Sequence, residues 1–168
     1  MLFSAPDVSD RRKGGAVLNE ALERLHDVDF GLIVAGANET PPFPRSFRSL
    51  LHLTDEDEIA LSYAAADVFV LPTLAENLPN AAIESLACGT PVVSFDVGGM
   101  PDAVRHLETG YLAKLADADA LAEGIRALLM DEALREKMSA TCREVAQREF
   151  STDVEAKRFV ELYQEVLH

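Results

Sequence analysis

Two glutamates, Glu76 and Glu84, lie near the middle of the chain with seven residues between them. Glu76 falls in a predicted loop, and Glu84 follows Asn80 by one turn of a predicted helix, so both carboxylates can face one cleft. A helix N-terminus binds phosphate through its free N–H groups, and a carboxylate beside it can accept hydrogen bonds from sugar hydroxyls. The alternative is an acid that complements the helix dipole and a second acid that is merely solvated. Together, the two glutamates predict a ligand with phosphate and polyol parts.

A cationic loop near the start of the chain carries the second candidate group. Arg11, Arg12 and Lys13 precede Gly14 and Gly15, and an amphipathic helix follows to about His26. The glycines admit a close backbone approach, and the helix dipole adds to the positive charge. This pattern predicts an anion site, with a solvated charged turn as the alternative.

The stretch from residue 66 to 104 must position the two glutamates. Asp67–Pro72 and Thr90–Phe95 are apolar runs typical of buried parallel strands. Between them we expect a helix over Leu78–Gly89 that is capped by Asn77, and a glycine-rich loop with another helix start follows the second strand. Strand, helix and strand form a right-handed βαβ unit, whose ligands bind outside the carboxyl ends of the strands.

The rest of the chain repeats this alternation. Four more runs predict strands, at Met1–Ala5, Asp29–Gly36, Leu50–Leu53 and Tyr111–Ala113, and residues 37–49 are predicted to be a loop. Helices are expected after a Thr54 cap, with Ile59, Leu61, Ser62 and Ala65 or Ala66 leading back to the central unit, and over Asp117–Met130 and Asp131–Arg148. A terminal helix carries an apolar stripe of Val154, Phe159, Leu162, Tyr163 and Val166. The predicted fold is α/β: a Rossmann-like, doubly wound parallel sheet of about six strands in residues 1–150, with a separate terminal helix in residues 151–168.

Composition excludes several classes of function. The net charge of -14 argues against binding to nucleic acid or to an anionic membrane surface, and 48% hydrophobic residues are typical of a compact domain. Cys88 and Cys142 have no CxxC spacing, and the sequence shows no secretory leader, so we expect reduced thiols in a cytoplasmic protein. We expect no metal site and no membrane span.

Several separate motifs match one known family. The Glu76-x7-Glu84 pair, the Ala87–Val93 segment ACGTPVV, the Gly98–Asp102 segment GGMPD and the Arg12–Gly14 loop RKG closely resemble the donor-binding signature of family four (group 1) retaining glycosyltransferases. These enzymes have the GT-B fold of two Rossmann-like halves, and the match covers the C-terminal, nucleotide-sugar-binding half. The resemblance implies transfer of a hexose-type sugar from a nucleoside diphosphate sugar to an acceptor hydroxyl, as in polysaccharide biosynthesis.

The same resemblance implies residue roles. Glu76 would contact the transferred sugar, Glu84 the ribose, and Lys13 with Arg12 the diphosphate. The backbone at Gly14 would approach the donor closely, the N–H groups of Asn77 and Leu78 would face the diphosphate or sugar, and His52 and Leu53 would lie near the base.

The resemblance also implies what lies outside the chain. No divalent metal or cofactor is expected, and a saccharide or lipid-linked acceptor, together with any peripheral membrane association, would involve the family's other half. We expect the chain to be a fragment that is inactive alone, whose terminal helix would cross to that half or drive self-association. The alternatives are a GT-B nucleotide-sugar epimerase or hydrolase half, and a non-catalytic flavodoxin-like regulatory module with a phosphorylatable aspartate.

Overall fold

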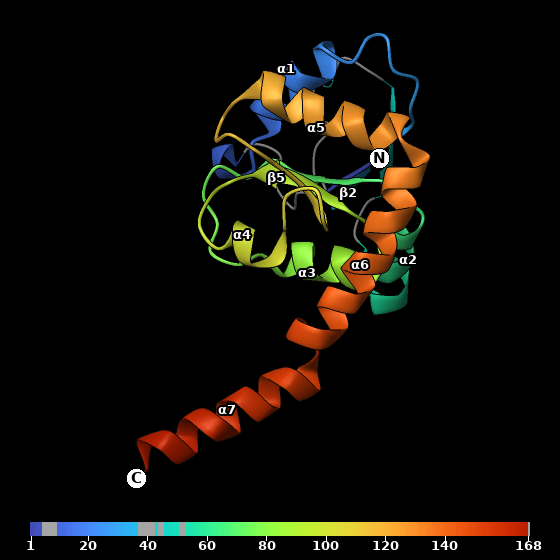
Figure 1. The fold of residues 1–168 in the computed structure, drawn as a ribbon. Helices are drawn as coiled ribbons and strands as arrows, with labels where there is room; N and C mark the ends of the chain where they lie inside the picture. Colours follow the sequence, from blue (N-terminus) through green and yellow to red (C-terminus); the bar gives the residue numbers. More distant parts are fainter. Residues whose placement is uncertain (5–9, 37–42, 44–45, 51–52, 168) are drawn as a thin grey trace.

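The protein is built around one parallel six-stranded sheet (Figure 1). The computed structural model describes residues 1–4, 10–36, 43, 46–50 and 53–167. The strands are β1 (Leu2–Ser4), β2 (Leu32–Ala35), β3 (Phe47–Leu50), β4 (Phe69–Leu71), β5 (Val92–Phe95) and β6 (Gly110–Ala113). Every pairing between neighbouring strands is parallel. The predicted fold class is therefore confirmed.

The strand order is β3-β2-β1-β4-β5-β6. It reverses between β1 and β4, which pair through Leu2 with Phe69 and Phe3 with Val70. This order is that of the dinucleotide-binding Rossmann fold and differs from the 2-1-3-4-5 order of flavodoxin-like modules. The regulatory-module alternative thus loses its structural basis, and the reversal point between β1 and β4 is where this fold binds ligands.

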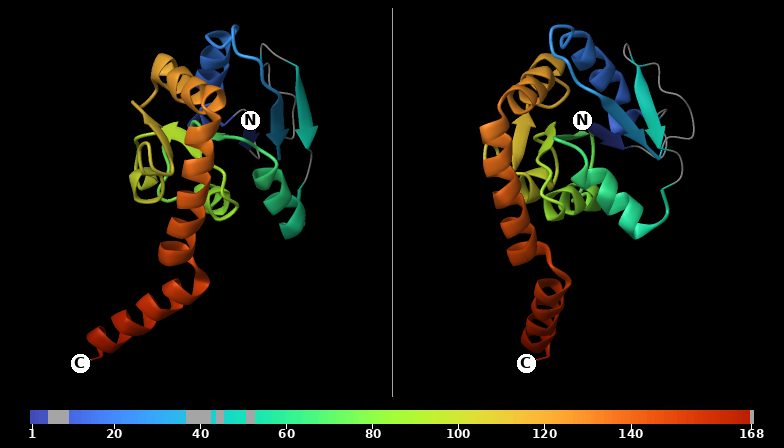
Figure 2. Two further views of the ribbon diagram at one scale, coloured as in Figure 1. Left: turned by 45° about the vertical axis from the view of Figure 1, so that its right-hand side comes forward. Right: turned by 90° about the vertical axis from the view of Figure 1, so that its right-hand side faces the viewer.

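Helices cover both faces of the sheet, and Figures 1 and 2 show these layers. Alternate strand residues face opposite sides, so Phe3 and Val70 join one apolar cluster, whereas Leu2 and Phe69 join the other. The first cluster packs against α1 and α5, and the second packs against α2, α3, α4 and part of α6. The helix bounds are α1 (Gly15–Glu23), α2 (Glu56–Ala64), α3 (Asn80–Ala87), α4 (Met100–Ala103), α5 (Ala118–Met130), α6 (Glu132–Phe150) and α7 (Thr152–Val166), with a 3-10 turn at Arg11–Lys13.

The third strand lies earlier in the chain than predicted. The prediction placed a strand at 50–53 and a loop at 37–49, but β3 comprises Phe47–Leu50 and pairs with β2 from Leu32 to Ala35. Because β3 is the outermost strand, Arg48 and Ser49 are exposed, and the strand lacks the continuous apolar run of a central strand.

Two predicted helix starts are also wrong. Helix α3 begins at Asn80 after Pro79, rather than at Leu78 after an Asn77 cap. Pro79 is extended at φ -75° and ψ 124°, and a proline disfavours helical backbone in the residue before it, so the helix cannot include Leu78. Asp55, rather than Thr54, caps α2, since its carboxylate accepts from the two N–H groups of Asp57 and Glu58.

The buried face of α2 includes Tyr63, to which the sequence analysis gave no role. Ser62 and Tyr63 are buried, whereas Leu61 is 67% exposed. The hydrophobic pattern of this short helix is weak, because its small alanines fit either side. The buried position of Tyr63 bears on the functional site.

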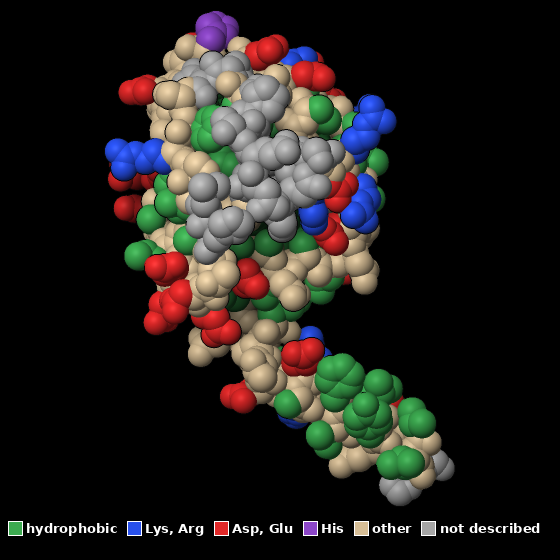
Figure 3. All heavy atoms as spheres, turned by 180° about the vertical axis from the view of Figure 1, so that it is seen from behind, with side chains coloured by type: hydrophobic (Ala, Val, Ile, Leu, Met, Phe, Trp, Pro, Cys, Tyr) green, Lys and Arg blue, Asp and Glu red, His purple; other side chains and the backbone are tan. Residues whose placement is uncertain are grey.

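The terminal helix α7 projects away from the sheet after a break at Ser151 (Figure 2). Its apolar side chains gather on an exposed surface in Figure 3, including Phe159, Leu162, Tyr163 and Val166. The division of the chain into residues 1–150 and 151–168 as separate units stays a prediction. In the described part of the chain, no helix has both the length and the apolar composition needed to cross a bilayer.

Candidate functional site

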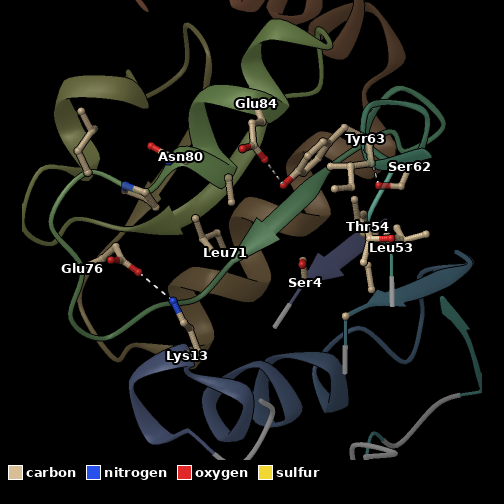
Figure 4. A pocket seen from close by; sticks show the side chains of 17 residues that line it. Ser4, Lys13, Leu53, Thr54, Ser62, Tyr63, Leu71, Glu76, Asn80 and Glu84 are labelled. Carbon is tan, nitrogen blue, oxygen red and sulfur yellow. Dashed lines mark hydrogen bonds and ion pairs between the residues drawn. The ribbon is translucent and has the colours of Figure 1, made fainter. Parts of the chain in front are cut away.

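A cavity of about 700 Å³ opens at the reversal point of the sheet (Figure 4). Ser4 and Leu71, the last residues of β1 and β4, line its floor, and Gly36 after β2 extends it toward the sheet edge. Asn80 and Glu84 of α3 form part of its wall. The volume lies within the range of small-molecule and cofactor sites, and the location is the one that the strand order predicts.

One end of the cavity holds an ion pair. The Nζ atom of Lys13 lies 3.0 Å from Oε2 of Glu76 (Figure 4), and the two side chains are 31% and 26% exposed. Lys13 comes from the turn before α1, and Glu76 from the loop after β4, 63 residues away. The cation and the first glutamate of the pair therefore meet at one point of the cavity.

Backbone contacts hold these two loops together. The carbonyl oxygen of Arg12 accepts from Thr73 Oγ1 at 3.0 Å and from the Leu74 N–H at 2.7 Å. Gly14, at φ +69°, lies so close to the Pro72 carbonyl that any side chain would collide with it. The glycine at residue 14 thus serves the approach of the two loops, and its own N–H already donates to the Arg11 carbonyl.

A third loop, after β5, supports Glu76 from the other side. Gly98, at φ +55°, lies against the Glu76 carbonyl oxygen, and the Gly99 N–H donates to the Asn77 carbonyl at 2.6 Å. The GGMPD segment therefore fixes the backbone of residues 76 and 77. Its glycines are required by this close approach, which explains their place in the motif.

The other end of the cavity holds Glu84 and Tyr63. The Tyr63 hydroxyl donates to Oε2 of Glu84 at 3.3 Å (Figure 4). Burial, followed by the nearby negative charge of Glu84 and this hydrogen bond, raises the pKa of Tyr63 well above its ordinary value. Tyr63 therefore remains a hydrogen-bond donor at any physiological pH.

The predicted site residues fall into two groups. Lys13, Leu53, Glu76, Leu78 and Glu84 all line the cavity, so the structure brings the principal candidates together. Glu76 and Glu84 line the same cavity, as the prediction of a shared cleft requires.

The remaining candidates lie elsewhere. The Arg12 guanidinium binds Asp10, with its NH2 nitrogen 2.7 Å from Oδ2, and the side chain is 74% exposed and not part of the cavity wall. Gly14 and Asn77 contribute their backbone to loop contacts as described above. His52 lies outside the described residues.

Sequence reasoning missed Tyr63. It lies in α2, next to the run Ala64–Ala66, and was given no role. A tyrosine that precedes a buried strand, among small residues, is a usable signal, because a buried phenol usually finds a hydrogen-bond partner.

Neither Cys88 nor Cys142 lines the cavity. Across the described ranges, no three His, Cys, Asp or Glu side chains gather closely enough to hold a metal ion. Both cysteines are free, and burial raises the pKa of the Cys142 thiol to about 12.

The fold and cavity define a Rossmann-like α/β domain, and comparison with known proteins identifies its family. The family model of group 1 glycosyl transferases matches residues 2–131, and the chain belongs to that family. The cation, the two carboxylates and the glycine loops thus occur in a glycosyltransferase domain.

Individual relatives agree with this assignment. The chain is 32% identical over 163 residues to D-inositol 3-phosphate glycosyltransferase of Xylanimonas cellulosilytica, and the match covers 90% of this chain but only 39% of the relative. Sucrose-phosphate synthase of Thermosynechococcus elongatus superimposes with a TM-score of 0.82 at 29% identity, covering 99% of this chain and 45% of that protein. Anabaena Alr3699/HepE in complex with UDP-glucose shares the fold, with a TM-score of 0.81 at 19% identity, covering 98% of this chain and 48% of that one. This chain therefore spans less than half the length of these proteins.

Proposed function

We propose that the cavity binds a nucleoside diphosphate sugar and that the chain is the donor-binding half of a retaining glycosyltransferase. The observation that carries the proposal is the joint placement of Lys13, Glu76 and Glu84 in one cavity, at the strand-order reversal of a group 1 glycosyltransferase domain. The related HepE structures contain UDP or UDP-glucose, which agrees with a donor of this class.

The chemical task of such a site is to stabilise negative charge on the departing diphosphate. Lys13 supplies a fixed cation, and the first N–H groups of α1, which have no partner within the helix, lie directly after it in the chain. Glu76 would orient the sugar, and Glu84 would accept from the ribose hydroxyls. Because Arg12 is bound to Asp10, we assign the main electrostatic role to Lys13 and not to Arg12.

The solved relatives are about twice as long as this chain, so they contain a further part that this chain does not match. In the proposed enzyme, that further part would form the second wall of the cleft and hold the acceptor. We propose that a saccharide or lipid-linked acceptor, and any membrane contact, involve residues beyond those of this chain. The exposed apolar surface of α7 would pack against such a partner segment. Alone, the 168-residue chain is expected to self-associate through this surface, and a monomer in size exclusion at high concentration would contradict that expectation.

Thermal unfolding with UDP, GDP or ADP, each compared with its nucleoside, tests the donor site. A ligand at about 100 times its dissociation constant adds roughly 2.7 kcal/mol to the free energy of unfolding, which corresponds to a rise in Tm of about 5 to 10 °C for this chain length. We expect the rise with one diphosphate, no comparable rise with its nucleoside, and loss of the effect in Lys13→Ala. No response of the intact chain to any diphosphate would contradict the proposal.

A further inference from the structure

The ring of Tyr63 is fixed in the core between α2 and β4. It is 4% exposed, and its ring lies edge-on to Phe69 with 5.1 Å between centroids. Its carbonyl oxygen accepts from the buried Thr90 hydroxyl at 2.7 Å. These contacts leave the phenol little freedom, and its hydroxyl emerges at the cavity wall (Figure 4).

Glu84 has the opposite character. It is exposed on the cavity face of α3 and lines the cavity. Within the described part of the chain, the Tyr63 hydroxyl is the side-chain group that donates a hydrogen bond to it. A donor on a buried ring therefore meets an acceptor on an exposed side chain, and the contact uses one of the two carboxylate oxygens.

We propose that Tyr63 is a positioning residue, whose hydroxyl holds Oε2 of Glu84 so that Oε1 is presented to the ribose hydroxyls of the donor. This inference rests on the proposed function, because it assigns the ribose end of the donor to Glu84. A phenol suits the task, since it donates to the carboxylate from a fixed ring and brings no charge that would compete with the diphosphate.

Removal of the Tyr63 hydroxyl distinguishes a positioning role from a role in packing the core. If Tyr63 served only to fill the core, phenylalanine would pack equally well, and the affinity for the ribonucleotide would not change. If the hydroxyl positions Glu84, its removal must weaken binding through the ribose and through nothing else. The difference is measurable with ligands that lack the ribose hydroxyls.

The test is isothermal titration of the intact chain with a nucleoside diphosphate and its 2',3'-dideoxy analogue, using whichever of UDP, GDP and ADP binds best. In Tyr63→Phe, we expect the ribonucleotide to bind about 3- to 10-fold more weakly, the size of one lost hydrogen bond, and the dideoxy analogue to bind as to the original protein. Tyr111→Phe is the matched control, because Tyr111 also packs edge-on to an aromatic ring, that of His106, but lies outside the cavity wall. It should change neither affinity.

A double-mutant cycle completes the design. In the Glu84→Ala background, Tyr63→Phe should have no further effect on the ribonucleotide. Equal weakening of both ligands by Tyr63→Phe, or an undiminished effect without Glu84, would overturn the inference and assign Tyr63 to packing alone. An unchanged ribonucleotide affinity in Tyr63→Phe would overturn it too. If the original protein binds none of the diphosphates, the proposed function is contradicted, and this inference, which rests on it, is contradicted as well.

Discussion

The ion pair between Lys13 and Glu76 predicts that one substitution will change the affinity for two ligands in opposite directions. Lys13 Nζ lies 3.0 Å from Glu76 Oε2, so a diphosphate that binds Lys13 must compete with this carboxylate for the cation. In the Glu76→Gln variant, the side chain that competes with the diphosphate for Lys13 is neutral. A bare nucleoside diphosphate should then bind more tightly, while a nucleoside diphosphate sugar loses the proposed contact between Glu76 and its sugar.

The size of the effect follows from the exposure of the pair. Both side chains are about 30% exposed, so solvent screens the attraction, and a pair of this kind contributes about 0.5 to 1 kcal/mol. Glu76→Gln should lower the free energy of unfolding by that amount and raise the affinity for the bare diphosphate about 2- to 5-fold. The repulsion between the carboxylate and the terminal phosphate, which carries more negative charge in the bare diphosphate than in the sugar donor, acts in the same direction.

Calorimetric titration at low and high salt is the measurement. At about 0.5 M salt or above, the screening length is only a few ångströms, and the gain for the bare diphosphate should shrink. Glu123→Gln is the control, because Glu123 is an exposed glutamate on α5 outside the cavity wall. Equal or weaker binding of the bare diphosphate by Glu76→Gln, or a gain that salt leaves intact, would refute the reasoning.

Three further predictions concern the loops, pH and metal. Gly98→Ala should unfold the site or lower the free energy of unfolding by about 2 kcal/mol or more, because the backbone is left-handed there and the new β-carbon would collide with the Glu76 carbonyl. Gly31→Ala is the control, since the space around Gly31 is open, and it should change the free energy of unfolding little in urea denaturation. Arg105, with its NH2 nitrogen 2.6 Å away, lowers the pKa of Glu149, so this carboxylate stabilises the fold fully above its unfolded pKa and loses that effect as the pH falls through the lowered folded value. Glu149→Gln should therefore cost up to about 1 kcal/mol at pH 7 and nothing in strong acid, and a constant cost across a pH series of denaturation curves would be contrary evidence. Since a lysine supplies the charge for the diphosphate, binding should be the same in EDTA as in magnesium, and a large loss in EDTA would require a metal ion at the site.

The sequence predicted the parts of this fold whose signals are local. The central strands β4 and β5 are buried on both faces, so each needs a continuous apolar run, and such a run is visible in one dimension. Helix α5 carries Leu121, Ile125 and Leu128 at helical spacing, and all three are buried. Where exposure on one side weakens the pattern, as in β3, the prediction misplaced the strand.

For the site, the sequence determined the residue types and their loops, and the tertiary structure decided which of them meet. Glu76 and Glu84 could be assigned to one cleft because they are close in the chain and flank one helix start. The pairing of Lys13 with Glu76, the diversion of Arg12 to Asp10 and the contact of Tyr63 with Glu84 depend on side-chain directions across separate elements. These directions follow from the order of strands and the packing of helices upon them, which no local pattern encodes. The sequence alone therefore determined the chemistry available to the site, and the packed sheet decided its geometry.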